Sequence, residues 1–349
     1  MKFLVTGGAG FIGSHLCEAL LEKNHKVLVI DDLSTGRYEN VSHMEGLSGF
    51  ELVIDTVLNK ALIETIVKSV DFIFHLASAV GVRLIIEQPV KTIETIVEGT
   101  SIVLCQARRY RKPVILTSTS EAYGKGTKVP FAEDDDILLG PTSKRRWAYA
   151  AAKMIDEFLA FAHWQETKLP VVCARLFNTV GPRQTGQYGM VIPRFIEQAL
   201  KNQDISVFGD GQQTRSFCHV RDIVKALIGL ANLREAAGKV VNIGNDQEIS
   251  INDLARRIKE LSGSVSKIVH VPYEEAYAEG FEDMMRRVPD LSLARQLIGF
   301  RPRYSLDDII EDIIRHCKTE HSSHFPGKVP EANPQKHPSR RRVQPFNRF

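Results

Sequence analysis

A tyrosine and a lysine four residues apart carry the clearest chemical pattern in the chain: Tyr149 and Lys153, within the segment Tyr149-Ala-Ala-Ala-Lys153. The periodicity of residues 147–165 predicts a helix, and this spacing puts both side chains on one helix face. A neighbouring ammonium group lowers the pKa of a phenol because it favours the charged form. The pattern therefore predicts that Tyr149 is a general base near neutral pH.

Three glycines near the N-terminus predict a dinucleotide site. Gly7, Gly10 and Gly13 follow a short apolar strand at 3–5 and open a helix predicted over 13–23. In a strand–turn–helix unit, glycines let the backbone approach a pyrophosphate, whose charge then lies at the helix N-terminus. The spacing is G-x-x-G-x-x-G, and its position after a strand and before a helix supports the interpretation.

Acidic residues end the next two predicted strands. Asp31 and Asp32 follow the strand 26–30, and Asp55 follows the strand 50–54. An acidic residue about 20 positions after the glycines accepts hydrogen bonds from an adenosine ribose. A carboxylate there repels a 2′-phosphate, so we predict NAD rather than NADP as the cofactor, with Asp31 or Asp32 as the ribose ligand.

Strands and helices must alternate regularly to position these groups. Because parallel strands carry ligands at their carboxyl ends, we predict an α/β fold: a Rossmann-type doubly wound parallel sheet with a smaller C-terminal substrate-binding domain. Thr119 falls at one such strand end. The predicted strands are 3–5, 26–30, 50–54, 72–77, 113–117 and 171–176.

The rhythm of the chain changes twice, and these changes predict its domains. We expect an NAD-binding domain over 1–180 and a smaller substrate-binding domain over 181–316, with a strand near 239–243 that returns to the sheet; the resemblance described below implies a nucleotide sugar as its ligand. The segment 317–349 is rich in His, Ser, Pro, Lys and Arg, which predicts a disordered basic tail. In the strand 72–77, His75 is interpreted as a core histidine rather than a catalytic one.

Bulk properties narrow the class of protein. The 349 residues carry a net charge of +3, which favours neither nucleic acid nor a membrane surface as the partner. No apolar run is long enough to span a membrane, and the N-terminal run is too short for a secretory signal. The five cysteines form no C-x-x-C pair, which indicates a reduced, cytoplasmic protein. No metal site is predicted.

In combination, these motifs resemble those of the extended short-chain dehydrogenase/reductase superfamily. Within it, residues 1–316 are similar to the nucleotide-sugar epimerase, dehydratase and decarboxylase branch, through the segments RLFNTVGPR, VFGDGQQTRSF and RRVPD. The resemblance implies an NAD-dependent enzyme that oxidises a UDP-sugar at C4. It also implies a homodimer formed through the helices near 90–109 and 149–165.

The resemblance assigns roles to single residues. Tyr149, assisted by Thr119, would take the proton from the sugar O4, and Lys153 would hold the nicotinamide ribose. A larger set of contacts is implied as well. The cofactor would contact Gly7, Gly10, Phe11, Ile12, Gly13, Asp31, Asp32, Asp55, Tyr149 and Lys153, and the substrate would contact Ser120, Asn178, Arg215 and Arg287.

The triplet Thr119-Ser120-Glu121 separates the possible reactions. Thr-Ser-Glu resembles the UDP-glucuronate decarboxylases and the GDP-mannose 4,6-dehydratases, with Glu121 as a catalytic residue. Decarboxylation of UDP-glucuronate to UDP-xylose is our first hypothesis. A 4-epimerase of UDP-glucose or UDP-glucuronate is the second, and a 4,6-dehydratase the third. A non-catalytic NAD-binding module is the alternative class. The loop 78–84 departs from the decarboxylase pattern, and Arg83 or Arg183 could pair with a uronate carboxylate.

Overall fold

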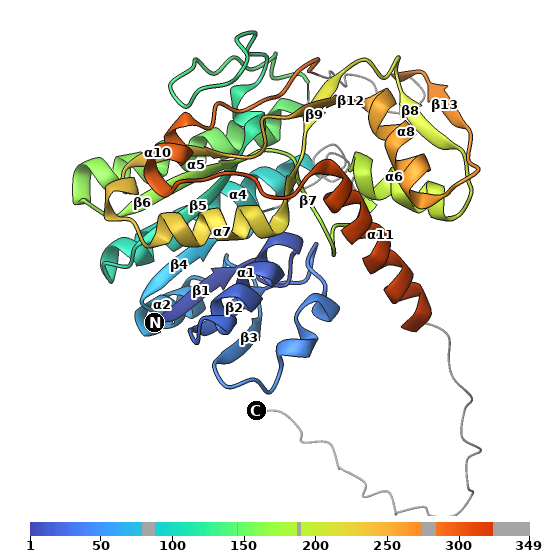
Figure 1. Cartoon of the computed structure of the whole chain (residues 1–349). Coiled ribbons are helices and arrows are strands. Elements are labelled where there is room, and N and C mark those ends of the chain that lie inside the picture. The colour runs from blue at the N-terminus through green and yellow to red at the C-terminus, as the bar shows by residue number, and fades with distance from the viewer. Residues whose placement is uncertain (79–87, 145, 187–189, 274–283, 324–349) are drawn as a thin grey trace, which may run out of the picture.

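A parallel sheet of seven strands forms the centre of the molecule (Figure 1). The structure, a computed structural model, describes residues 1–78, 88–144, 146–186, 190–273 and 284–323. The strand order is β11-β6-β5-β4-β1-β2-β3. Each central strand is a short apolar run buried on both faces, as expected for a sheet covered by helices on two sides. The strands are β1 (Lys2–Thr6), β2 (Lys26–Asp31), β3 (Phe50–Ile54), β4 (Phe72–His75), β5 (Val114–Thr119), β6 (Val171–Leu176) and β11 (Lys239–Ile243).

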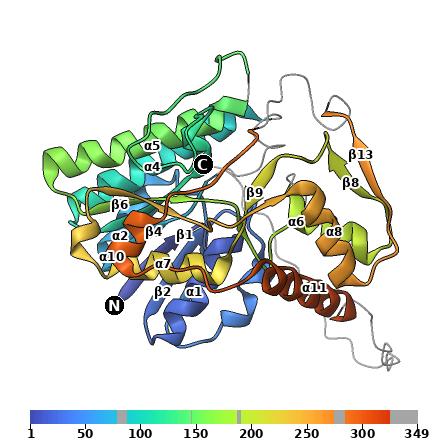
Figure 2. The same cartoon turned by 45° about the horizontal axis from the view of Figure 1, so that its top comes forward.

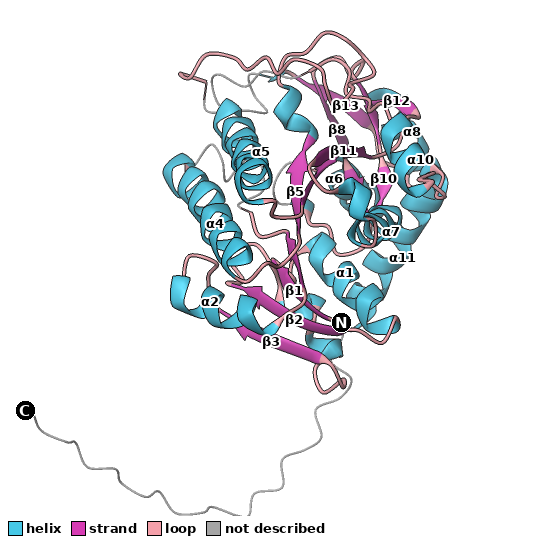
Figure 3. Cartoon of the chain, turned by 90° about the vertical axis from the view of Figure 1, so that its left-hand side faces the viewer, coloured by secondary structure: helices cyan, strands magenta, loops and turns pink. Residues whose placement is uncertain are grey.

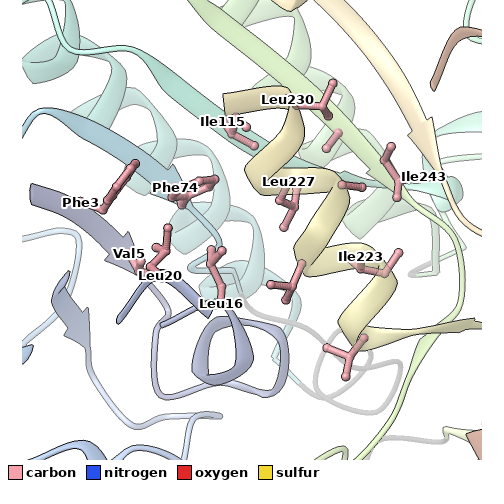
Figure 4. Close-up of a cluster of buried hydrophobic side chains, with 14 of the residues drawn as sticks. Phe3, Val5, Leu16, Leu20, Phe74, Ile115, Ile223, Leu227, Leu230 and Ile243 are labelled. Atoms are coloured by element: carbon pink, nitrogen blue, oxygen red, sulfur yellow. The ribbon is translucent and has the colours of Figure 1, made fainter. Parts of the chain in front are cut away.

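Helices cover the two faces of this sheet (Figure 3). One face packs on α1 (Phe11–Glu22), α7 (Val220–Ala231) and α10 (Ser292–Ile298). The other face packs on α2 (Lys60–Ser69), α4 (Pro89–Arg109) and α5 (Arg146–Thr167). Figure 4 shows the first of these two cores, in which side chains of α1 and α7 meet side chains of the strands. The residues labelled there are Phe3, Val5, Leu16, Leu20, Phe74, Ile115, Ile223, Leu227, Leu230 and Ile243.

A smaller group of elements lies beside the carboxyl ends of the strands (Figure 2). Its own core is formed by α6 (Val191–Leu200), α8 (Ile251–Ser262), α11 (Leu306–Ser323) and the parallel pair β8 (Ile205–Phe208) and β13 (Ile268–Val271). Two further strand pairs connect it to the sheet. They are β9 (Thr214–Ser216) with β12 (Glu248–Ser250), and β7 (Thr179–Val180) with β10 (Cys218–His219). Single 3₁₀ turns complete the fold as η1 (Tyr38–Asn40), η2 (Ser42–Met44), η3 (Ser120–Tyr123) and η5 (Arg234–Ala236).

The structure corrects one prediction about the C-terminal end. Helix α11 continues to Ser323, so residues 317–323 of the predicted tail are helical. The extension is explained by Cys317, because this side chain packs against the core that α11 shares with α6 and α8. The remainder of the predicted tail, 324–349, lies outside the described residues. No helix in the described part of the chain is both long and apolar enough to cross a membrane.

His75 is a core histidine, as the sequence predicts. Its ring nitrogens lie 2.8 Å from Thr6 Oγ1 and 3.1 Å from Thr100 Oγ1. Burial, followed by the positive charge of Lys153, lowers the pKa of His75 to about 3. The ring is therefore neutral at physiological pH and joins β1, β4 and α4 through two hydrogen bonds.

Candidate functional site

A cavity of about 630 Å³ lies at the carboxyl ends of the central strands. The glycine turn and the ends of β2 and β5 line it on the sheet side, and residues of α6, β8 and β9 line it on the other side. Every residue predicted for the site lines this cavity. These residues are Gly7, Gly10, Phe11, Ile12, Gly13, Asp31, Asp32, Asp55, Thr119, Ser120, Glu121, Tyr149, Lys153, Asn178, Arg215 and Arg287.

The glycine turn forms a cradle that side chains would fill. Gly7 has a φ of +71°, and a Cβ on it would lie 2.8 Å from the backbone nitrogen of Ala77. A Cβ on Gly13 would overlap the carbonyl oxygen of Gly7 and lie 2.7 Å from Gly8 Cα. Gly10 is the N-cap of α1 and lines the cavity. The first turn of α1 therefore presents backbone amides to the cavity, which fits the pyrophosphate of a dinucleotide.

Asp31 stabilises this cradle as well as lining it. Its carboxylate accepts hydrogen bonds from the backbone N–H groups of Ala9 and Leu33, both at 2.9 Å. Burial raises the pKa of Asp31, the two backbone donors oppose that effect, and neighbouring Asp32 adds to it. A carboxylate has about four lone-pair sites, so Asp31 retains acceptor capacity for a ribose. Asp55 accepts hydrogen bonds from Thr56 N and Asn59 Nδ2 at the start of α2.

The prediction of a lowered pKa for Tyr149 is wrong for this structure. Burial, followed by the negative charge of Glu121, raises the pKa of Tyr149 above its ordinary value, and a hydrogen bond with Thr119 opposes the increase. Lys153, expected to lower this pKa, has its Nζ 2.9 Å from Asp156 Oδ2, and the negative charge of Asp156 further raises the pKa of Tyr149. The Tyr–Lys spacing places both residues at the cavity, and a third residue decides the charge that the phenol meets.

Arg287 lies at the same end of the cavity as the catalytic candidates. Its Nη1 donates to Glu121 Oε1 at 2.7 Å, and Glu121 N donates to Thr119 Oγ1 at 3.2 Å. The Arg287 side chain is 8% exposed, and its Nε has no hydrogen-bond partner among the described residues. A buried guanidinium donor of this kind suits an anionic ligand. Ser120, between Thr119 and Glu121, is buried in the cavity wall.

The two other predicted substrate ligands are tied to the backbone around the cavity. Asn178 Nδ2 donates to the carbonyl of Ser216 at 2.8 Å. Arg215 Nη1 donates to the carbonyls of Thr214 and Met284, each at 2.8 Å. These bonds connect the end of β6 with β9 and with the segment that leads to Arg287. Both side chains therefore help to shape the cavity that they line.

Arg183, a candidate for a uronate carboxylate, already has an acidic partner. It lines the cavity, and its Nη2 lies 2.5 Å from Glu18 Oε1. Burial raises the pKa of Glu18, but hydrogen bonds from His15 and Arg183 outweigh it and lower this pKa to about 2. The other candidate, Arg83, and most of the loop 78–84 lie outside the described residues.

Sequence reasoning missed the far wall of the cavity. Gln213 Nε2 donates to the hydroxyl of Tyr273 at 3.0 Å, and the Arg194 guanidinium lies 3.7 Å from the Phe208 ring centroid. These residues come from three separate segments of the chain. Near Asp31, the residues Ser34, Thr35, Gly36, Arg37 and Asn40 also line the cavity. Only the segment VFGDGQQTRSF gave a signal for any of them, through Phe208 and Gln213.

The cavity is lined by the glycine cradle, the acidic end of β2 and the helix face that carries Tyr149 and Lys153. The sequence that forms these elements matches a known family. The model of the family described as GDP-mannose 4,6 dehydratase matches residues 4–313. The chain belongs to this family. Its membership confirms the predicted nucleotide-sugar branch, and solved members with the same fold confirm the Rossmann-type sheet.

Individual relatives of the family carry out several reactions. The chain is 42% identical to UDP-N-acetyl-alpha-D-glucosaminuronate decarboxylase of Bacillus cytotoxicus, over 90% of this chain and 97% of the relative. It is 37% identical to UDP-glucuronic acid decarboxylase 1 of Xenopus tropicalis, over 91% of this chain and 72% of the relative. The structure of UDP-glucuronic acid 4-epimerase from Bacillus cereus, in complex with UDP-glucuronic acid and NAD, superimposes with a TM-score of 0.80. That epimerase is 29% identical, over 92% of this chain and all of the other.

These relatives confirm that the family member described here is an enzyme of nucleotide-sugar metabolism that uses NAD. The glycine cradle fits that cofactor, because a side chain at Gly7 or Gly13 would collide with the neighbouring backbone, so only glycine allows this tight turn at the cavity. The roles of single residues in the cavity remain predictions, and they enter the proposal below.

Proposed function

We propose that this protein is an NAD-dependent decarboxylase of a UDP-hexuronate. The observation that carries the proposal is the Glu121–Arg287 ion pair, which lies beside Thr119 and Tyr149 in the cavity. The 42% identity to a UDP-hexosaminuronate decarboxylase and the 37% identity to a UDP-glucuronate decarboxylase support the same reaction class. UDP-glucuronate is the first substrate to test, and its 2-acetamido analogue is the second.

In this proposal, NAD supplies one function: it accepts a hydride from C4 of the sugar and later returns it. Tyr149, hydrogen-bonded with Thr119, takes the proton from the O4 hydroxyl as the 4-ketone forms. Oxidation at C4 places the ketone β to the C6 carboxylate. Such a β-keto acid loses CO₂ with its bonding electrons left on C5 and delocalised onto O4. Lys153 would hold the nicotinamide ribose from the same helix face as Tyr149.

Glu121 and Arg287 suit the carboxylate-losing end of the substrate. Arg287 is buried, and its Nε–H has no hydrogen-bond partner among the described residues, so this group can donate to an oxygen that carries negative charge. Glu121 fixes the guanidinium through the bond to Nη1. The pair therefore holds the guanidinium in place at the cavity, with its Nε left to donate to a uronate oxygen.

The test is an assay of the purified protein with UDP-glucuronate, UDP-N-acetylglucosaminuronate and UDP-glucose, following released CO₂ and the sugar product. We expect CO₂ and UDP-xylose or its 2-acetamido counterpart from a uronate, and no CO₂ from UDP-glucose. Conversion of UDP-glucuronate to UDP-galacturonate without CO₂ would establish the second candidate, a 4-epimerase. The likeness to UDP-glucuronic acid 4-epimerase is the specific observation in favour of that candidate.

A matched pair of variants tests the role of Glu121. Glu121→Gln keeps the shape of the side chain and removes its charge, so we expect decarboxylation to fall by about 10²-fold, the scale for a positioned acid–base or charged group. The control is Glu248→Gln, because Glu248 is also paired with an arginine, Arg286, but does not line the cavity. Equal activity of the two variants would remove Glu121 from the mechanism.

We also propose that the protein forms a homodimer through α4 and α5, which lie side by side on one face of the sheet (Figure 1). Large apolar side chains on both helices are exposed: Val90 by 67%, Ile93 by 40%, Ile155 by 46% and Phe158 by 66%. A contiguous apolar face of this kind is typical of an interface. The domain boundaries at 180 and 316 and the cytoplasmic location remain parts of this proposal. The five cysteines are free, which is consistent with a reducing compartment.

A further inference from the structure

Lys153 shares its ammonium group with a carboxylate on its own helix. Asp156 follows it by three residues on α5, and Lys153 Nζ lies 2.9 Å from Asp156 Oδ2. Both side chains are buried, Lys153 with 3% and Asp156 with 0% of the side chain exposed. Water therefore screens the pair only weakly. The negative charge of Asp156 therefore opposes, at Tyr149, the effect expected of the Lys153 ammonium group.

Two buried cations on elements that pack against α5 or line the cavity are matched in the same way. Arg175 on β6 binds Glu157 of α5 with Nη2 at 2.7 Å and Nε at 3.0 Å. Arg287 binds Glu121 of η3 at 2.7 Å. Each of these two arginines thus has a carboxylate partner that balances its charge.

The remaining titratable groups of the neighbouring elements add no charge close to the phenol. His75 on β4 is neutral, since burial and then the Lys153 charge lower its pKa to about 3. Burial raises the pKa of the Cys173 thiol on β6 well above its ordinary value, so this group is neutral as well. On α4, Thr100 is not titratable, and Lys91 at the cavity rim is exposed to solvent.

We propose that Asp156 is a positioning residue that offsets the charge of Lys153 and so sets the pH at which Tyr149 becomes a base. This inference rests on the proposed function, in which Tyr149 takes the O4 proton. The inference follows from where the two residues lie. Asp156 is one helix turn after Lys153 on α5, and its side chain has no exposed surface. Asp156 does not line the cavity, so it acts through Lys153 and not on the substrate.

The sign of the effect follows from electrostatics. Tyr149 must be ionised to act as a base, so kcat/KM falls as pH decreases through the acid limb of its profile. That limb reports the loss of the Tyr149 phenol proton in the active form. Removing the Asp156 charge leaves an uncompensated cation, which favours loss of that proton. The acid limb therefore moves to lower pH in a neutral variant.

The experiment compares Asp156→Asn with wild type in the NAD-loaded full-length protein. We expect the acid limb of kcat/KM to shift down by about 0.5 to 1 pH unit, because an opposite charge at short range shifts a pKa by about that much or more. At pH values below the wild-type limb, the variant is then about three- to tenfold more active than wild type at the same pH. Asp156→Glu, which restores the charge, is expected to restore the limb.

Asp222→Asn is the matched control. Asp222 is an equally buried carboxylate that binds the backbone N–H groups of Arg303 and Tyr304, outside the cavity. Its loss should lower thermal stability without moving the limb. If Asp156→Asn does not fold, Asp156→Ser replaces it, since the smaller side chain leaves room for a water molecule beside Lys153. A folded neutral variant with an unmoved limb overturns the proposal, as does failure of both neutral variants to fold.

A second readout separates this inference from the proposed reaction. Tyrosinate formation is titrated by ultraviolet difference absorbance, and Tyr149 is isolated by subtracting the same titration of Tyr149→Phe. We expect Tyr149 to ionise at lower pH in Asp156→Asn than in wild type, whatever sugar the enzyme accepts. Absence of CO₂ release with every uronate would contradict the proposed function, and an unchanged Tyr149 titration would contradict the role of Asp156.

Discussion

Gly13 offers a stringent test of the cofactor cradle, because its neighbour is backbone. In Gly13→Ala, the new Cβ would overlap the carbonyl oxygen of Gly7 and lie 2.7 Å from Gly8 Cα. Overpacking against side chains costs about 1–3 kcal/mol, and a backbone neighbour cannot rotate away, so we expect about 3 kcal/mol. Alanine in a helix recovers about 1 kcal/mol relative to glycine. The net loss of about 2 kcal/mol is the difference between these two effects.

Two further glycines make this prediction specific. Gly10→Ala places its Cβ no closer than 3.1 Å to a neighbour, the Gly7 oxygen, and the Gly10 φ of −73° suits alanine. Since Gly10 lines the cavity, we expect a stability near wild type but NAD affinity at least about tenfold weaker, about 1.4 kcal/mol. Gly229→Ala in α7 meets only ordinary contacts at 3.6 Å, so its expected effect is a small gain in stability.

The assay measures the thermal unfolding midpoint with and without NAD, and NAD binding by calorimetry, for the three alanine variants. The expected order of stability is Gly229→Ala, then wild type and Gly10→Ala, then Gly13→Ala. Both cradle variants should lose NAD affinity, and the helix control should keep it. A Gly13→Ala protein that unfolds at the wild-type temperature and binds NAD normally would refute the close approach between α1 and the glycine turn.

Four other outcomes are expected. Tyr149→Phe should lower turnover by about 10²-fold or more while bound NAD is retained, and steady-state kinetics with a cofactor count will show whether it does. Asp31→Ala should weaken discrimination against NADP, as measured by the ratio of the two dissociation constants; an unchanged ratio would move the ribose contact to Asp32. Glu18, whose folded-state pKa is about 2, stabilises the protein above its unfolded pKa of about 4.3, and this contribution is lost as pH falls toward about 2. Urea unfolding of wild type and Glu18→Gln should therefore differ near neutral pH and converge in strong acid. Phe158→Asp should convert the proposed dimer to a monomer in sedimentation experiments, whereas Val265→Asp, at an exposed valine outside α4 and α5, should leave that dimer intact; a monomeric wild type would contradict the proposed dimer.

Much of the fold was predictable because its signals are local. The strand–glycine–helix unit at 3–23 and the acidic end of β2 lie within contiguous stretches, where steric demand and hydrophobic period specify the backbone. The Tyr149–Lys153 spacing specifies a shared helix face for the same reason. Tyr149, Thr119, Asp31 and the glycines therefore came from the sequence as members of one site, since parallel strands bring their carboxyl ends to one edge.

The tertiary structure decided which charge meets which. Glu121 and Arg287 are 166 residues apart, and no period or motif could pair them. The sequence indicated that Lys153 would lower the pKa of Tyr149, whereas the fold buries Lys153 against Asp156, whose negative charge opposes that effect. Local spacing thus determined where the catalytic groups stand. Their protonation depends on burial and on partners from distant segments, because electrostatic interactions act through space and strengthen where water is excluded.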